Sequence, residues 1–154
     1  MCIRDSHYAE RRIEVRAAPY GQVTDMVEHQ GRAITEEISN TAFVREAVRP
    51  QRVVVNRDHD HKRLVGKVTR LDALRDDGLH ATLGISRTPL GDETLALAAD
   101  GVLAASVGMR VPPDGQHWDS SRRHRRITSA VLDHISLVPD PAYPGASVIA
   151  VRHR

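Results

Sequence analysis

Short apolar runs and apolar–polar alternation at a period of two residues dominate the chain, and this pattern is typical of β-strands. Residues 53–55 are three consecutive valines, whose β-branching favours a buried strand. Turn-forming residues separate the runs; residues 76–78, Asp-Asp-Gly, join two of them. The predicted strands are residues 12–23, 33–38, 52–56, 64–71, 79–85, 103–110, 126–138 and 146–151.

Two segments have helical spacing instead. Residues 89–100 predict an amphipathic helix of about three turns, with Gly101 placed to end it in the left-handed conformation. Residues 42–48 predict a shorter helix that Pro50 stops, and the polar, turn-rich residues 112–123 predict a loop. Because helices do not alternate with strands, we expect a mainly β protein with some helix (α+β). Its core would be an antiparallel β-barrel of about seven strands flanked by short helices.

Length and composition exclude some classes of binding partner and indicate the redox state of the compartment. The 154 residues suffice for a single domain, which we expect over residues 11–152, with residues 1–10 a disordered or non-native leader. Aromatic residues are only 3% and the net charge is +2, so no nucleic-acid partner is expected. No apolar run has the length of a membrane span, so no membrane partner is expected. Cys2 is the only cysteine, which excludes a disulfide within the chain and fits a reducing cytoplasm.

One predicted strand carries a serine among small residues. Side chains alternate between the two faces of residues 103–110, so Ala104, Ser106 and Gly108 share one face. Around Ser106 this face has only small side chains, which leaves room for another segment of the chain to pack against the hydroxyl group. A serine becomes a nucleophile only when a base takes its proton. The alternative is that Ser106 is only a small residue in a tight barrel interior.

Two histidines are candidates for that base and for the group that orients it. His59 follows the buried strand at residues 52–56, where a rigid scaffold can present a side chain to a cleft. His134 shares a strand face with Leu132 and Ser136, and among apolar neighbours it needs a hydrogen-bond partner. The third member of such a site is usually a carboxylate, but a second imidazole can orient the first. Each histidine taken alone also fits a structural role.

The polar turn around His59 also contains metal-ligand residue types. Asp58, Asp60 and His61 lie close enough in sequence for some of them to bind one ion. Ligands from one turn would need partners elsewhere, and the chain has no H-E-x-x-H motif or similar arrangement. We therefore expect no metal and no other cofactor.

Four landmarks, in this order, resemble the tailed-phage prohead (capsid maturation) proteases, which share a fold with the herpesvirus assemblins. The first two are Ser-Asn-Thr-Ala-Phe at residues 39–43 and Val-Val-Asn-Arg-Asp-His-Asp at residues 54–60. The last two are Ala-Ser-Val-Gly-Met at residues 105–109 and Asp-His-Ile-Ser-Leu-Val at residues 133–138. The resemblance extends over residues 11–151 and implies an assemblin-like barrel.

Carried over residue by residue, the resemblance implies that Ser106 is the nucleophile, His59 the general base and His134 the third member. Many phage members have Glu at the third position, whereas the assemblins have His there, as this chain does. A Ser-His-His arrangement is therefore implied. Asp133 is expected on the opposite face of the strand from His134.

The resemblance implies a serine endopeptidase that processes the major capsid protein and its scaffold segment, and also itself, inside the prohead in the bacterial host cytoplasm. The resemblance also suggests a homodimer, because dimerisation activates the assemblins. Two alternatives stay open. One is a non-catalytic capsid-assembly or scaffold-binding module of the same fold, and the other is a metal-dependent hydrolase using Asp58, His59 and His61.

Overall fold

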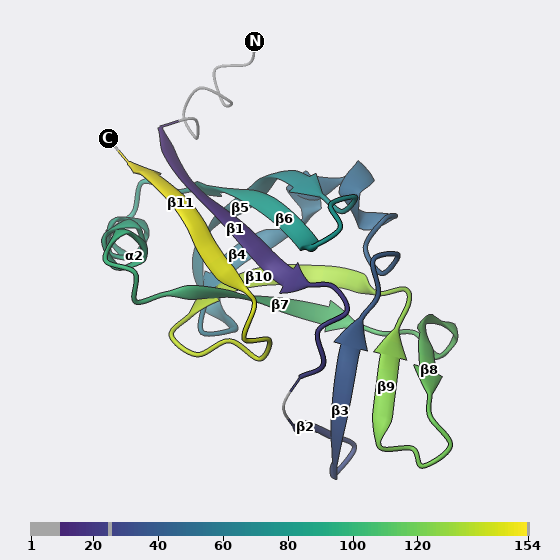
Figure 1. Ribbon diagram of the computed structural model, residues 1–154. Coiled ribbons are helices and arrows are strands. Elements are labelled where there is room, and N and C mark those ends of the chain that lie inside the picture. The colour runs from purple at the N-terminus through teal and green to yellow at the C-terminus, as the bar shows by residue number, and fades with distance from the viewer. Residues whose placement is uncertain (1–9, 25, 154) are drawn as a thin grey trace.

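Two β-sheets contain most of the residues of the computed structural model, which describes residues 10–24 and 26–153 (Figure 1). The expected leader, residues 1–10, lies outside the described residues except for Glu10. The strands are β1 (Arg11–Pro19), β2 (Val27–His29), β3 (Arg32–Ile38), β4 (Val54–Arg57), β5 (Asp60–Asp72), β6 (Gly78–Ile85), β7 (Ala104–Arg110), β8 (Gln116–Trp118), β9 (His124–Ile127), β10 (Val131–Val138) and β11 (Ser147–His153). The described helices are α2 (Pro89–Ala99) and the 3₁₀ helices η1 (Glu46–Val48), η2 (Pro50–Arg52) and η3 (Pro113–Gly115).

The larger sheet has seven strands, in the order β11-β1-β6-β5-β4-β10-β7, and curls into a half-barrel (Figure 1). Its neighbouring strands are antiparallel except for β10 and β4, which run parallel. Apolar side chains such as those of Ile13, Val55, Leu83 and Ile135 are fully buried in one core. Removing this apolar surface from water is the main force that holds the sheet in its curled shape. The predicted mainly β class with a seven-stranded main sheet is confirmed.

The smaller sheet, in the order β2-β3-β9-β8, projects beyond the half-barrel (Figure 1). Within it, β3 and β9 run parallel. The prediction of one continuous strand over residues 126–138 is wrong, because β9 ends at Ile127 in the smaller sheet and β10 begins at Val131 in the larger one. The connecting backbone turns to donate hydrogen bonds elsewhere, including from Ala130 N–H to the carbonyl oxygen of Ala42. Alternation of apolar residues runs through this break, so the pattern does not reveal it.

Two further predictions of local structure need correction. Residues 42–48 form turns and the short helix η1 instead of one helix, because only Ala42 and Phe43 of this segment are buried while Val44 and Val48 are exposed. A helix that short is marginal unless one whole face is packed. Residues 112–123 are not wholly a loop, since they contain η3 and β8.

Helix α2 forms as predicted, and its ends show why. Thr88 caps the start, its side-chain oxygen accepting the backbone N–H of Gly91 at 3.0 Å, and Pro89 occupies the first turn. After the helix, Gly101 has φ of +76°, a conformation that favours glycine. The chain then enters β7, so this cap sets where the Ser106 strand begins.

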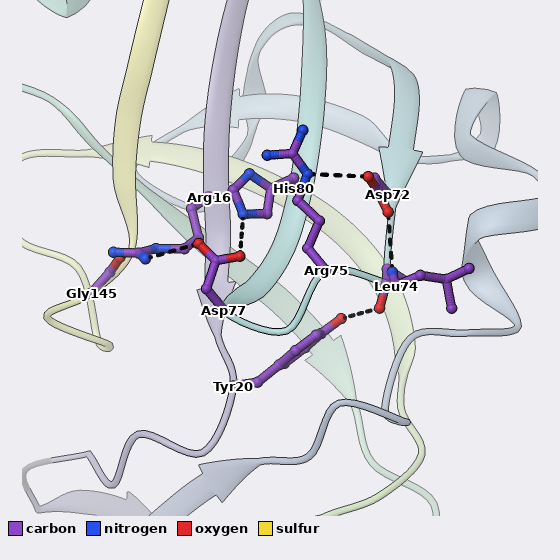
Figure 2. A network of polar contacts seen from close by, with 9 residues as sticks. Arg16, Tyr20, Asp72, Leu74, Arg75, Asp77, His80 and Gly145 are labelled. Atoms are coloured by element: carbon purple, nitrogen blue, oxygen red, sulfur yellow. Dashed lines mark hydrogen bonds and ion pairs between the residues drawn. The ribbon is translucent and has the colours of Figure 1, made fainter.

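Polar contacts fasten the turn between β5 and β6 to the rest of the molecule (Figure 2). Arg16 donates to the carbonyl oxygen of Gly145 at 2.8 Å and to Asp77 at 3.3 Å. His80 contacts the other oxygen of Asp77 at 2.9 Å. Tyr20 donates to the backbone of Ala73, and burial raises the pKa of its phenol to about 12. Together these contacts connect β1, the β5–β6 turn and the segment before β11.

The helices of the described residues include none that is both long and apolar enough to cross a membrane.

A buried ion pair joins β3 to β9 within the smaller sheet, and Tyr143 links this pair to the segment between β10 and β11. Glu36 on β3 accepts from Arg125 on β9 at 2.5 Å and from the hydroxyl group of Tyr143 at 2.7 Å. The side chains of Glu36 and Arg125 are both about nine-tenths buried. Among the described residues between β10 and β11, Tyr143 is the one that hydrogen-bonds to Glu36. Neighbouring Glu37 is about one-quarter exposed and contacts the more exposed Arg126 at 3.6 Å and His124 at 3.8 Å.

We predict that Glu36→Ala destabilises the protein by about 3–5 kcal/mol, because it leaves the Arg125 charge buried without its partner. Glu37→Ala is the matched control on the same strand and should cost only about 0–1 kcal/mol. Urea unfolding followed by circular dichroism measures both. Equal effects of the two substitutions would show that the Glu36 network does not stabilise the fold.

Candidate active site

Three strands of the larger sheet bring Ser106, His59 and His134 together. Strand β10 lies between β4 and β7, and its ladder with β7 places Ser136 opposite Ser106 and His134 opposite Gly108. Its parallel ladder with β4 leads to the β4–β5 turn that carries His59. The three residues predicted from the sequence therefore lie side by side although 75 residues separate the two histidines.

The three side chains form a continuous chain of hydrogen bonds. Nε2 of His59 lies 3.0 Å from Oγ of Ser106. Nδ1 of His59 lies 2.7 Å from Nε2 of His134. Ser106 and His134 are 5% and 7% exposed, whereas His59 sits at the surface. Both ends of this chain are thus buried, while the His59 side chain between them can be reached from solvent.

The backbone of His59 is held by a residue that sequence reasoning did not assign to the site. Ser136 Oγ accepts the backbone N–H of His59 at 2.8 Å and donates to the carbonyl oxygen of Asn56 at 3.3 Å. Asp58 and His59 both have φ of +56°, an uncommon conformation for residues other than glycine. Ser136 therefore helps to fix a strained turn that aims the His59 ring at Ser106. The available signal was its position two residues after His134 on the same strand face.

Asp133 also lies in the site, which corrects the expectation that it faces away from His134. Its carboxylate oxygen is 2.7 Å from Nδ1 of His134. The ladder between β10 and β7 pairs Leu132 with Met109 and His134 with Gly108, so Asp133 is an extra residue in a β-bulge. The bulge also corrects the predicted face of Leu132, whose side chain packs in the apolar core.

Gly108 makes room for the imidazole of His134. A Cβ atom at this position would overlap three ring atoms of His134, since the ring lies directly over the glycine backbone. The Ser-x-Gly spacing of residues 106–108 thus has a steric reason. Ser106 and the glycine surface against which His134 packs lie on the same face of β7.

Burial and neighbouring charges set the protonation of the site. Burial, followed by the nearby His134, lowers the pKa of His59 below its ordinary value, and the carboxylate of Asp58 offsets part of this effect. The hydrogen bond to His134 lowers the pKa of Asp133, which keeps its carboxylate charged. The site therefore combines an imidazole that stays neutral near neutral pH with an anionic carboxylate at the far end.

The metal-ligand set considered from the sequence, Asp58, His59 and His61, does not gather around one point. Asp58 pairs with Arg63 at 2.5 Å, and both ring nitrogens of His59 are hydrogen-bonded within the site. Among the described residues, the group with convergent ligand atoms is His61, Asp133 and His134.

A serine hydroxyl group within hydrogen-bond distance of a neutral imidazole, itself oriented by a third group, is the arrangement of a serine hydrolase. Residues 3–154 match the model of the family described as caudovirus prohead serine protease. The match spans nearly the whole chain, so the chain belongs to this family of phage serine peptidases. The resemblance inferred from the four sequence landmarks is confirmed. No curated protein sequence matches the chain.

We predict that Gly108→Ala lowers the cleavage rate about 10²-fold, because the added methyl group displaces His134 and with it the His59 ring. It should also cost about 1–3 kcal/mol of stability through overpacking. The rate is measured by cleavage of a capsid precursor, and stability by urea unfolding.

The matched test repeats Gly108→Ala in a His134→Ala background, where the ring is absent. The stability cost should then largely disappear, a coupling that a double-mutant cycle measures. An unchanged cost in that background would show that the glycine is needed for another reason.

Proposed function

We propose that this family member is a serine endopeptidase that cleaves the major capsid protein and its scaffold segment, and also itself, with Ser106 as nucleophile, His59 as general base and His134 as third member. The observation that carries the proposal is the chain of contacts from Ser106 through His59 to His134, at 3.0 and 2.7 Å. Family membership supports the prohead interior, in the cytoplasm of a bacterial host, as the place of action.

One assignment of protons satisfies every contact in this chain. Charged Asp133 accepts Nδ1–H of His134, which leaves Nε2 of His134 as an acceptor. That nitrogen accepts Nδ1–H of His59, so Nε2 of His59 has a free lone pair that accepts the Ser106 hydroxyl proton. Asp133 is thus a positioning residue that acts through His134.

The proposed reaction follows from these positions. His59 takes the Ser106 proton as Oγ attacks the scissile carbonyl group, and His59 then gives that proton to the leaving amine. His134 stabilises the imidazolium that forms, and Asp133 stabilises His134 in turn. Water repeats the sequence to release the acyl group from Ser106. A histidine relay supplies less charge than a direct carboxylate, which fits an enzyme whose substrates are concentrated within one shell.

We predict that co-expression with the capsid and scaffold genes of the same phage yields trimmed products only when Ser106 and His59 are both present. Ser106→Ala and His59→Ala should each lower the cleavage rate by about 10⁴–10⁶-fold, which removes the product bands from a gel. Ser121→Ala, at an exposed serine whose hydroxyl group contacts Asp119, is the matched control and should cleave normally. Identical bands from all variants would identify a non-catalytic assembly module instead.

We predict that activity falls as pH drops through a pKa below 6.5, because His59 must be neutral to accept a proton and its pKa is lowered in the folded protein. Asp58→Asn should move this acidic limb to still lower pH, since the Asp58 carboxylate raises the pKa of His59. The pH dependence of kcat/KM measures both effects. A limb above pH 6.5, or one that moves upward in Asp58→Asn, would contradict His59 as the base.

A further inference from the structure

We propose that His61, Asp133 and His134 form a binding site for a zinc-class divalent cation, and that the bound ion switches the protease off. Ligand atoms from the three side chains all lie within 4.8 Å of one another. The switch rests on the proposed function, because it acts through the catalytic role of His134. The binding site itself does not depend on that role.

The three ligands come from two elements that the site already holds together. His61 lies at the start of β5, just after the turn that carries His59, while Asp133 and His134 lie in the bulge of β10. The rings of His61 and His134 meet edge to face, with centroids 5.2 Å apart and planes at 83°. The bulge is essential here, because a regular strand would direct Asp133 to the other face.

The donor set suits zinc better than the hard cations. Two imidazole nitrogens and one carboxylate oxygen are the ligands of open zinc sites, in which water takes the fourth position. Magnesium and calcium prefer oxygen ligands in larger numbers. Tetrahedral bonds of about 2.1 Å place ligand atoms about 3.4 Å apart. The Asp133 oxygen and Nδ1 of His134, which are 2.7 Å apart without the ion, would therefore separate slightly, and a rotation of the exposed His61 side chain would complete the set. Within the described residues, the ring of His61 forms no hydrogen bond that would oppose this rotation.

Cation binding would move the proton of each histidine ring in the Ser106–His59–His134 chain from Nδ1 to Nε2. A metal on Nδ1 of His134 takes the lone pair at that nitrogen, so the neutral ring must carry its proton on Nε2. His134 then donates to Nδ1 of His59, where the free protein has the opposite direction. His59 in turn carries its proton on Nε2, which faces Ser106 at 3.0 Å. A protonated Nε2 cannot accept the hydroxyl proton, so Ser106 loses its base without any change in net protonation.

The first experiment measures binding independently of catalysis. Untagged Ser106→Ala protein is titrated with zinc chloride by calorimetry at a pH of about 7.5, where imidazoles are mostly neutral. We expect saturable binding of one ion per chain, weakened at least about tenfold by His61→Ala. His117→Ala removes an exposed histidine on β8 and is the matched control. No saturable binding, or equal affinity in all three proteins, would overturn the site.

The second experiment tests the switch. Zinc should inhibit cleavage by the wild-type protein, and His61→Ala, compared with its own rate without zinc, should lose most of that inhibition. Histidine ¹⁵N NMR of the Ser106→Ala protein reports the tautomer without any proteolysis, and zinc should move the His59 proton from Nδ1 to Nε2. Inhibition that persists in His61→Ala, or a His59 tautomer unchanged by bound zinc, would overturn the switch.

These readouts separate the two proposals. An active protease that binds no zinc at these residues refutes only the cation site. Zinc binding with the expected tautomer change in a protein that cleaves nothing refutes the proposed protease function and, with it, the regulatory role.

Discussion

Strand β10 hydrogen-bonds to β4 along one edge and to β7 along the other, and the site exists only while both ladders keep their register. The first ladder leads to the turn that carries His59, and the second places Ser106 opposite Ser136. A slip of one residue in either ladder would turn a side chain of the candidate site to the opposite face of the sheet. The apolar residues of β10, including Ile135 and Leu137, hold this register because they are fully buried in the core.

The β-bulge in β10 gives this site its particular chemistry. By adding one residue between Leu132 and His134, it leaves Leu132 in the core and places Asp133 against His134, which in turn contacts His59. Many serine hydrolases place a carboxylate directly against the imidazole that contacts the serine. Here Asp133 contacts His134, and His134 contacts His59. The same bulge that orients the relay also creates the convergent donor set with His61, so catalysis and cation binding would compete for one nitrogen of His134.

Support for the site comes from groups that never touch a substrate. Ser136 holds the backbone of His59 in its left-handed conformation, and Gly108 leaves the space that the His134 ring fills. Neither contribution depends on charge, so the geometry of the site is built from packing and backbone hydrogen bonds. The pKa of His59 is lowered mainly by the partial burial of its ring, so the fold itself favours the neutral imidazole.

Local sequence determined most strands of the larger sheet, helix α2 with its Thr88 and Gly101 ends, and the three candidate side chains, because period, capping chemistry and residue type act over a few residues. Its four landmarks, in order, also pointed to the family. Only tertiary structure decided that residues 126–138 divide between two sheets, because backbone partners far along the chain end one strand and start the next. It alone revealed the bulge at Asp133, the clamp by Ser136 and the distances among Ser106, His59 and His134. These features depend on register between strands far apart in sequence, which no local pattern encodes.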